Sequence, residues 1–212
     1  MVTLAPVHLT IVAKAPVPGR VKTRMLPSCS PTDAAELAAA ALADTLETAV
    51  ASAADQVQVA LDGDPGEWLP PGVRVFGQCE GTLGERLAHI WEVIGAPGLQ
   101  IGMDTPQLVV ADLDDALDRV TSVRADAVLG PAWDGGWWAI GFSRHCPGAF
   151  GGVPMSRRDT GQRQLARLRE LGLEVELLPT RRDADDVDDA LAVAAERPGT
   201  RFAYAVERIL RG

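Results

Sequence analysis

Short apolar runs alternate along this chain with longer helix-like segments. The apolar runs predict strands at Val7–Ala13, Gln56–Leu61, Val73–Phe76, Leu99–Met103, Val128–Gly130, Trp137–Phe142 and Val175–Leu178. The longer segments predict helices at Asp33–Ala53, at 82–94, and near 160–171, 187–196 and 202–211. Strands that alternate with helices in this way favour an α/β fold, a three-layer sandwich with a mostly parallel sheet.

Local signals mark the starts of three predicted helices. Asp33 and Glu36 lie in the first turn of the first helix, where acidic side chains interact favourably with the helix dipole. The stretch Thr82-Leu-Gly-Glu85 has the spacing of a capping box. After the fourth predicted strand, Thr105 offers a helix cap and Pro106 a residue suited to the first helical position. We therefore expect a helix to begin directly after Thr105.

The composition indicates a folded protein rather than a nucleic-acid or membrane binder. The chain has 212 residues, 47% of them hydrophobic, and no linker long enough to separate two domains, so we expect one domain over residues 1–212. A net charge of −9 argues against broad binding to nucleic acid or membrane surfaces. Three widely spaced cysteines without a C-x-x-C pair fit a reducing compartment, and no apolar run approaches the roughly 20 residues of a membrane span. These features predict a cytoplasmic protein and leave its oligomeric state open.

A basic segment follows the first predicted strand. Lys14, Arg20, Lys22 and Arg24 all precede the first acidic residue, which is at position 33. Lysine and arginine supply charge and N–H donors that suit phosphate oxygens, and Gly19 allows the backbone to come close to a ligand. The segment therefore predicts a phosphate-binding loop, against the alternative of an ordinary solvated basic turn. We expect its charges to be exposed and their removal to change stability little.

Acidic residues follow two other predicted strands. Asp104 ends the strand Leu99–Met103, at the edge of the sheet where ligands bind in open α/β folds. A carboxylate there suits Mg²⁺, although it is equally consistent with a helix-start residue. The segment 181–189 holds five aspartates, of which Asp183 or Asp185 is a candidate second ligand. The others, including Asp188 and Asp189, are interpreted as solvated charge at a helix N-terminus.

Three tryptophans cluster around a predicted turn. Trp133, Trp137 and Trp138 flank Asp134-Gly-Gly136, a sequence typical of tight turns. Adjacent strand residues face opposite ways, so Trp137 and Trp138 cannot both enter one core layer. One of them is expected in the core, while the other, with Trp133, is a candidate wall of a pocket for a base, sugar or apolar acceptor. The alternative is that all three are scaffold residues.

Several common site motifs are missing from the sequence. It has no G-x-x-x-x-G-K-[ST] phosphate loop, no G-x-G-x-x-G dinucleotide turn and no G-x-S-x-G nucleophile elbow. The three histidines, His8, His89 and His145, show no metal-ligand or triad spacing, and we interpret them as structural.

Four motifs in order resemble one protein family. They are Ala13–Arg24, Gly81–Arg86, Gly102–Leu108 and Gly130–Gly136. Together they resemble the DUF2064 family of glycosyltransferase-A type, called radical-SAM/selenodomain-associated transferase 1 in some bacterial gene clusters. This family is similar to 2-phospho-lactate guanylyltransferases and, more distantly, to molybdenum-cofactor nucleotidyltransferases. The resemblance covers roughly residues 7–190.

The resemblance implies a nucleotide-diphospho-sugar transferase fold with a divalent metal, Mg²⁺ or Mn²⁺. It implies that Arg20, Lys22 and Arg24 hold the phosphates and that Asp104 and Asp185 hold the metal, so we expect Lys22, Arg24 and Asp104 to carry the catalysis. From the tryptophan turn we expect Trp133, Asp134 and Trp137 to line the acceptor pocket. The residues implied to bind the nucleotide are Lys14, Gly19, Arg20, Gly81, Gly84 and Arg86. The chain departs from the family where Trp133 replaces an acid and Trp137-Trp138 replace tyrosines.

These observations predict a metal-dependent transferase that uses a nucleotide-linked substrate and a small-molecule acceptor. Nucleotidyl transfer is favoured, with an acceptor attacking the α-phosphorus of a nucleoside triphosphate and pyrophosphate leaving. Such chemistry needs positioning and charge neutralisation more than a covalent nucleophile. The alternatives are a glycosyltransferase that uses a nucleotide-diphosphate sugar and a non-catalytic nucleotide-binding protein. The base, the acceptor and the pathway stay open.

Overall fold

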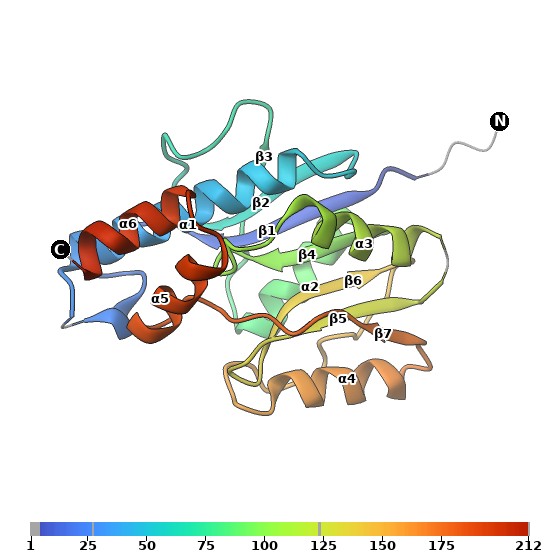
Figure 1. Cartoon of the computed structure of the whole chain (residues 1–212). Helices are drawn as coiled ribbons and strands as arrows, with labels where there is room; N and C mark the ends of the chain where they lie inside the picture. Colours follow the sequence, from blue (N-terminus) through green and yellow to red (C-terminus); the bar gives the residue numbers. More distant parts are fainter. Residues whose placement is uncertain (1–4, 27, 123, 212) are drawn as a thin grey trace.

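The structure is a computed structural model that describes residues 5–26, 28–122 and 124–211. Its described strands form one seven-stranded sheet in the order β3-β2-β1-β4-β6-β5-β7 (Figure 1). The strands are β1 (His8–Lys14), β2 (Gln56–Asp62), β3 (Arg74–Gly77), β4 (Gly98–Gly102), β5 (Ala127–Pro131), β6 (Trp137–Phe142) and β7 (Val175–Leu177). Each coincides with a strand predicted from the apolar runs, with boundaries that differ by at most one residue.

Six α-helices and one short 3-10 helix occur in the described residues. They are η1 (Thr23–Met25), α1 (Pro31–Val50), α2 (Leu83–Ile94), α3 (Val110–Thr121), α4 (Thr160–Glu170), α5 (Val187–Glu196) and α6 (Arg201–Leu210). The predicted capping box at the start of α2 is confirmed: the Thr82 backbone N–H donates to Glu85 Oε2 at 2.7 Å. None of the helices in the described ranges has the length and apolar character needed to cross a membrane.

The sheet is mostly parallel, as predicted. β1 pairs in parallel with β2 and β4, β2 with β3, and β5 with β7, whereas β6 runs antiparallel to both β4 and β5. The carboxyl ends of the parallel strands therefore meet at one edge. Lys14, Asp62 and Gly77 end strands there, and the antiparallel β6 begins at the same edge with Trp137.

Helices cover both faces of the sheet and give the predicted three layers. α1 and α3 pack on one face against Leu9, Ile11 and Leu99, while α2 and α4 pack on the other face against Ile140 and Phe142. Figure 1 shows α1 and α3 on the opposite side of the sheet from α4, with α6 lying along α1. The α/β sandwich predicted from the alternating pattern is thus confirmed.

The predicted start of the helix after β4 is wrong. α3 begins at Val110, and residues 105–108 form a turn in which the Leu108 N–H donates to the Thr105 carbonyl. The carbonyls of Pro106 and Leu108 accept hydrogen bonds from the Arg197 guanidinium at 3.2 and 2.7 Å. These tertiary hydrogen bonds replace the helical ones that local sequence favours at Thr105 and Pro106.

Candidate functional site

The loop after β1 folds back toward the end of β4. Lys22 has a left-handed backbone conformation, with φ of 48°, and directs its side chain inward. Its ammonium lies 2.5 Å from Asp104 Oδ1, 3.4 Å from Asp185 Oδ1 and 2.6 Å from the Ala184 carbonyl oxygen. The Lys22 side chain is only 5% exposed. The expectation that this charge is exposed is therefore wrong, because two distant carboxylates give it a buried partner set.

The electrostatics keep the Lys22 ammonium charged. Burial by itself lowers the pKa of Lys22, but the charges of Asp104 and Asp185 and their hydrogen bonds raise it, so the pKa lies above its ordinary value. A lysine fixed in this way joins the loop after β1 to the end of β4. The hydrogen bond that it donates to the Ala184 carbonyl ties in the segment before α5 as well.

The other basic residues of the loop surround the same place. Arg24 is largely exposed and donates to Asp185 Oδ2 at 2.7 Å. A cavity of about 200 Å³ is lined by Lys14, Arg20, Val21, Lys22, Thr23, Arg24, Ala38, Met103, Asp104 and Asp185. Four predicted phosphate-binding residues and both predicted metal ligands therefore share one cavity, as the sequence analysis expected.

Backbone pairing brings the distant acidic segment to Asp104. The chain after β7 runs beside the end of β5, where the Arg181 N–H donates to the Pro131 carbonyl at 3.1 Å. Farther on, the Ala184 N–H donates to the Asp104 carbonyl at 2.8 Å. Asp183 and Asp185, on either side of Ala184, are thereby placed beside the end of β4.

Four carboxylates lie close enough at this edge of the sheet to influence one another electrostatically. Asp183 is partly buried, and that burial, followed by the charges of Asp104, Asp134 and Asp185, raises its pKa to about 8, although Lys22 opposes the shift. A group of negative oxygens at the end of a strand has the donor chemistry that Mg²⁺ and Mn²⁺ prefer. The raised pKa of Asp183 reports its burial and the repulsion from the neighbouring carboxylates.

The predicted metal ligands are bridged by a side chain of the protein itself. The Lys22 ammonium contacts both Asp104 and Asp185. Within residues 5–26, 28–122 and 124–211, no three His, Cys, Asp or Glu side chains converge on one point as a ligand set. Carboxylate oxygens are donors of the type that suits a divalent cation, but the described residues do not arrange them as a ligand set. The assignment of Asp104 and Asp185 as metal ligands stays a prediction.

The remaining aspartates of the 181–189 segment have individual roles. Asp186 caps α5 by accepting a hydrogen bond from the Asp189 N–H at 2.9 Å, and Asp188 is exposed at the start of the helix. Asp189 differs from its interpretation as solvated charge, because it is paired with Arg182 at 2.6 Å and partly buried. The Arg182 guanidinium also lies 4.2 Å from the centre of the Trp133 ring.

The two adjacent tryptophans of β6 face opposite sides of the sheet, as predicted. Trp138 is buried in the layer under α1 and α3, and its indole N–H donates to the Pro179 carbonyl at 3.0 Å. Trp137 lies in the other layer, with its ring 6.3 Å from that of Phe150. Trp133 is 66% exposed beneath Arg182. Trp138 is therefore the core residue of the three.

The turn between β5 and β6 is packed against a basic segment that the sequence analysis did not single out. A Cβ at Gly135 would lie 1.9 Å from the Arg158 carbonyl oxygen, and the Gly161 N–H donates to the Gly135 carbonyl at 2.8 Å. Ser156 has a left-handed φ of 57°. This contact places Arg157 and Arg158 beside the acidic residues, and only the glycine at 135 hints at it in the sequence.

Two cavities open next to these residues. The larger, about 860 Å³, is lined by Arg24, Trp133, Asp134, Gly135, Ser156, Arg157, Arg158, Arg182, Asp183, Asp185, Asp186 and Asp189. The smaller, about 220 Å³, contains Asp104, Asp134, Trp137 and Asp183 in its lining. The three residues predicted to form one acceptor pocket are thus divided: Trp133 lines the larger cavity, Trp137 the smaller, and Asp134 both.

The segment 81–86 contributes Leu83 to the lining of the smaller cavity. Gly81 has a left-handed φ of 118°, and Gly84 lines a further cavity of about 760 Å³ with the 148–156 segment. Arg86 turns toward the ends of β2 and β3, 3.6 Å from Asp62 Oδ2 and 3.0 Å from Gln78 Oε1. The structure therefore places Gly81, Gly84 and Arg86 outside the linings of the cavities that hold Lys22 or Asp185.

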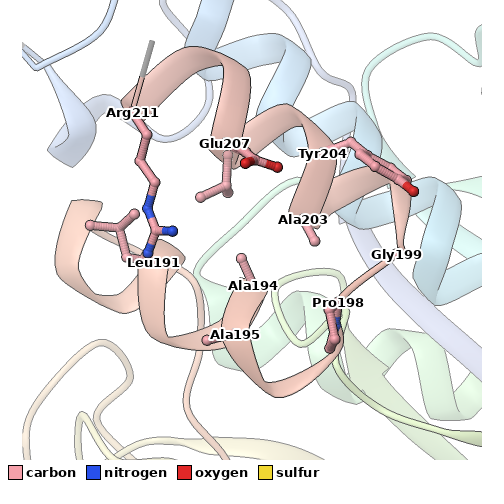
Figure 2. Close-up of a pocket in the computed structure, with 10 residues that line it drawn as sticks. Leu191, Ala194, Ala195, Pro198, Gly199, Ala203, Tyr204, Glu207 and Arg211 are labelled. Atoms are coloured by element: carbon pink, nitrogen blue, oxygen red, sulfur yellow. The ribbon is translucent and has the colours of Figure 1, made fainter.

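A separate hollow lies between the last two helices. Residues of α5, α6 and the loop between them line a cavity of about 200 Å³. Figure 2 shows Leu191, Ala194 and Ala203 around it, with Glu207 and Arg211 at its side. Its lining includes none of the basic-loop residues or site aspartates. It therefore belongs to the packing of α5 on α6, apart from the candidate site.

Comparison with known families gives one match. The model of a family described as "Uncharacterized protein conserved in bacteria (DUF2064)" matches residues 36–157, more than half of the chain. This range contains Asp104, the segment 81–86 and the turn at 133–136, whereas the basic loop and Asp185 lie outside it. No curated protein matches the sequence.

Solved structures share the fold. A candidate nucleotide-diphospho-sugar transferase from Desulfovibrio desulfuricans G20 has 25% identity and a TM-score of 0.86, covering 97% of this chain and 95% of its own. A UDP-glucose pyrophosphorylase from Acinetobacter baumanii has 12% identity and a TM-score of 0.58, covering 95% and 97%. A nucleotidyl transferase from Methanothermobacter thermautotroptrophicus has 14% identity and a TM-score of 0.55, covering 88% and 95%.

Proposed function

We propose, on the premise that the chain belongs to the DUF2064 family, that this protein is a metal-dependent transferase. Its proposed substrate is nucleotide-linked. Nucleotidyl transfer from a nucleoside triphosphate to a small acceptor, with release of pyrophosphate, is the reaction that we favour. One observation carries the proposal: Lys22 of the basic loop contacts Asp104, so the basic and acidic residues lie at one place.

The exposed members of the basic loop suit a polyphosphate. Lys14, Arg20 and Arg24 line a cavity beside Asp104, and no acidic residue comes from the loop itself. Guanidinium groups bind phosphate oxygens through two parallel N–H donors, and they neutralise charge on a pyrophosphate as it leaves. We propose that Arg20 and Arg24 hold the phosphates, with Gly19 giving the turn that presents them.

Asp104 and Asp185 are the proposed ligands of Mg²⁺ or Mn²⁺. When bound, such a cation supplies charge neutralisation for the phosphate oxygens. The Lys22 ammonium contacts both carboxylates. We propose that Lys22 also limits repulsion among the aspartates before substrate binds.

The chemical step forms one bond and breaks another. An acceptor oxygen attacks the α-phosphorus, and the bond from that phosphorus to the bridging oxygen of the β-phosphate breaks, so that pyrophosphate leaves with the electron pair. A phosphate or carboxylate acceptor has no proton to lose in this step. Asp134, which lines both larger and smaller cavities, stands on the proposed acceptor side with Trp133 and Trp137.

Sugar transfer is the second candidate function. The Desulfovibrio relative, whose name refers to nucleotide-diphospho-sugars, is the one with 25% identity over nearly all of both chains. In that reaction the acceptor attacks the sugar carbon and a nucleoside diphosphate leaves. The larger cavity, about 860 Å³, has room for a sugar beside the aspartates.

Ligand-induced stabilisation followed by product analysis tests the proposal. The chain is heated with each nucleoside triphosphate and each common nucleotide-diphosphate sugar, with and without Mg²⁺ or Mn²⁺. A ligand at 100 times its Kd adds about 2.7 kcal/mol to the free energy of unfolding. Pyrophosphate among the products supports nucleotidyl transfer, and a nucleoside diphosphate supports sugar transfer. If no nucleotide of either kind stabilises the chain, the proposed function is wrong.

A further inference from the structure

A buried amide on β4 lacks hydrogen-bond partners. Gln100 is 0% exposed, and neither its Nε2 nor its Oε1 has a partner among the described residues. The neighbouring polar side chains in the sheet do have a partner. Thr10 pairs in register with both Gln58 and Gln100, and Gln58 Nε2 donates to Thr10 Oγ1 at 3.2 Å. Gln100 is therefore the unsatisfied end of a polar row that crosses three strands.

Gln100 lines the smaller cavity described above. The walls of that cavity are largely apolar, formed by Val12, Leu83, Leu87, Trp137 and Met155, while Asp104, Asp134 and Asp183 stand along it as well. Val12 packs in the layer under α2, and it is two residues from the register partner of Gln100. The amide thus lies on the sheet face that the cavity covers, and it makes no hydrogen bond to any of the described residues.

Packing alone does not account for this amide. Leucine or methionine has nearly the same volume, and burial of an unpaired amide is unfavourable where an apolar side chain would serve. A buried polar group left unpaired by the protein discriminates strongly between ligands that can and cannot pair with it. The unpaired amide of Gln100 therefore points to a ligand rather than to a structural requirement.

We propose that the smaller cavity binds the acceptor, and that Gln100 selects an acceptor whose inner end presents an N–H group beside a carbonyl. A primary amide offers one acceptor and two donors, so its natural partner is another amide edge, such as that of a lactam or a carboxamide. The apolar walls suit a small ring. Naming this ligand the acceptor rests on the proposed function, whereas the amide selectivity of the cavity does not.

The positions of Gln100 and Asp104 in the cavity determine which end of such an acceptor would lie near the aspartates. Gln100 lies within β4, whereas Asp104 lies beyond the carboxyl end of that strand, and both line the cavity, so the amide end of the acceptor would lie over the sheet and the other end by the aspartates. The reacting oxygen would then lie beside Asp104 and Asp183, next to the cavity of the basic loop. The selecting residue and the proposed metal ligand thus stand at opposite ends of one cavity.

Binding of three ring compounds of similar shape tests this inference. The probes are 2-piperidone, which has the N–H and the carbonyl, N-methyl-2-piperidone, which lacks the donor, and cyclohexanone. Each is titrated into the full chain without nucleotide, and the Trp137 indole N–H signal is followed by NMR, assigned with a Trp137→Phe variant. We expect 2-piperidone to bind at least tenfold more tightly than the other two.

Substitution of the amide supplies the second half of the test. Gln100→Met, or Gln100→Leu if the first variant does not fold, is expected to remove the preference for 2-piperidone while cyclohexanone still binds. It is also expected to leave the melting temperature of the free chain unchanged or higher. Gln58→Met, in the same polar row but outside the cavity lining, is the matched control and should keep the preference.

Three results overturn the inference: equal binding of the three probes to the parent, no binding of any of them, or a preference that survives in Gln100→Met. A large loss of stability in both Gln100 variants would also overturn it, because it would make Gln100 a structural residue. Failure of the proposed function is a separate result. If the chain selects the lactam but binds no nucleotide, the cavity still binds amides selectively, and only the assignment of that ligand as the acceptor is wrong.

Discussion

Lys22 Nζ lies 2.5 Å from Asp104 Oδ1, and this contact joins the loop after β1 to the end of β4. Because the ammonium also contacts Asp185, it connects all three segments that the sequence analysis had treated as separate candidates. A basic loop for phosphate and a pair of acids for metal are therefore parts of one arrangement. Changes to Lys22 should act on the fold as well as on binding.

Loss of the Lys22 ammonium is expected to destabilise the chain. Breaking a fully buried ion pair costs about 3–5 kcal/mol, and we expect roughly 2–4 kcal/mol for Lys22→Met because its partner Asp104 is 37% exposed. The methionine keeps the apolar stem, so the loss reports the charge. Urea denaturation gives the free energy of unfolding.

Arg24→Ala is the matched control for that change. Arg24 is also paired with Asp185, but its side chain is 68% exposed, and exposed pairs contribute less than about 1 kcal/mol. Arg24→Ala should leave stability nearly unchanged and weaken nucleotide binding by about 1.5–3 kcal/mol, the scale of a charge-assisted hydrogen bond. Equal stability losses in the two variants would contradict the buried role of Lys22.

The proposed metal ligands are tested by the Mg²⁺ dependence of nucleotide affinity. Asp104→Asn should remove most of the enhancement that Mg²⁺ gives, because a neutral amide is a poor ligand for a hard cation. It should bind metal-free nucleotide at least as well as the parent, because one repulsive charge near the phosphates is gone. Asp185→Asn should show a milder form of both effects. Isothermal titration calorimetry measures each affinity.

Asp188→Asn is the control for these substitutions. Asp188 is exposed at the start of α5 and should not change the response to Mg²⁺. Asp189 is unsuitable as a control because it pairs with Arg182. An Asp104→Asn variant that keeps the full enhancement by Mg²⁺ would show that Asp104 is no ligand and serves the fold alone.

The sequence predicted the elements because their signals are local. Apolar runs such as those of β1 and β6, and the capping box at Thr82, depend on residues within one element. The opposite orientations of Trp137 and Trp138 follow from strand geometry alone. The carboxyl edge of the sheet then brought the basic loop and Asp104 together, as open α/β sheets require.

The errors occurred where distant partners decide the outcome. Lys22 was expected on the surface because its sequence neighbours are Gly, Pro and Arg, while its partners Asp104 and Asp185 come from other elements. Asp189 was interpreted as solvated charge; its partner, Arg182, lies in the same 181–189 segment, so this error is an exception to the rule of distant partners. The buried state of Gln100 likewise depends on cross-strand packing, which no spacing in the sequence reveals.

The turn before β6 should tolerate no side chain at Gly135. A Cβ there would come within 1.9 Å of the Arg158 carbonyl oxygen, in a backbone conformation with φ of 90°. We expect Gly135→Ala to cost on the order of 2–4 kcal/mol, because the contact is with backbone and adds to the cost of a left-handed alanine. Gly152 has a φ of 74°, but a Cβ added there would have no atom within 4 Å, so Gly152→Ala should cost only about 1 kcal/mol. Thermal unfolding of both variants measures the difference, and equal losses would mean that the 135–158 contact is not tight.

Tryptophan fluorescence should report ligand entry into the larger cavity. Trp133 is 66% exposed, lines that cavity and lies under the Arg182 guanidinium, so a phosphate or acceptor that draws Arg182 away should change its emission. Trp133→Phe should remove the change on nucleotide binding and leave stability within about 0.5 kcal/mol, as exposed substitutions usually do. Trp138→Phe should instead keep the change and lose about 1–2 kcal/mol, because the buried indole donates to the Pro179 carbonyl. Emission that stays constant at saturating nucleotide in the parent would show that Trp133 lies outside the nucleotide-binding site.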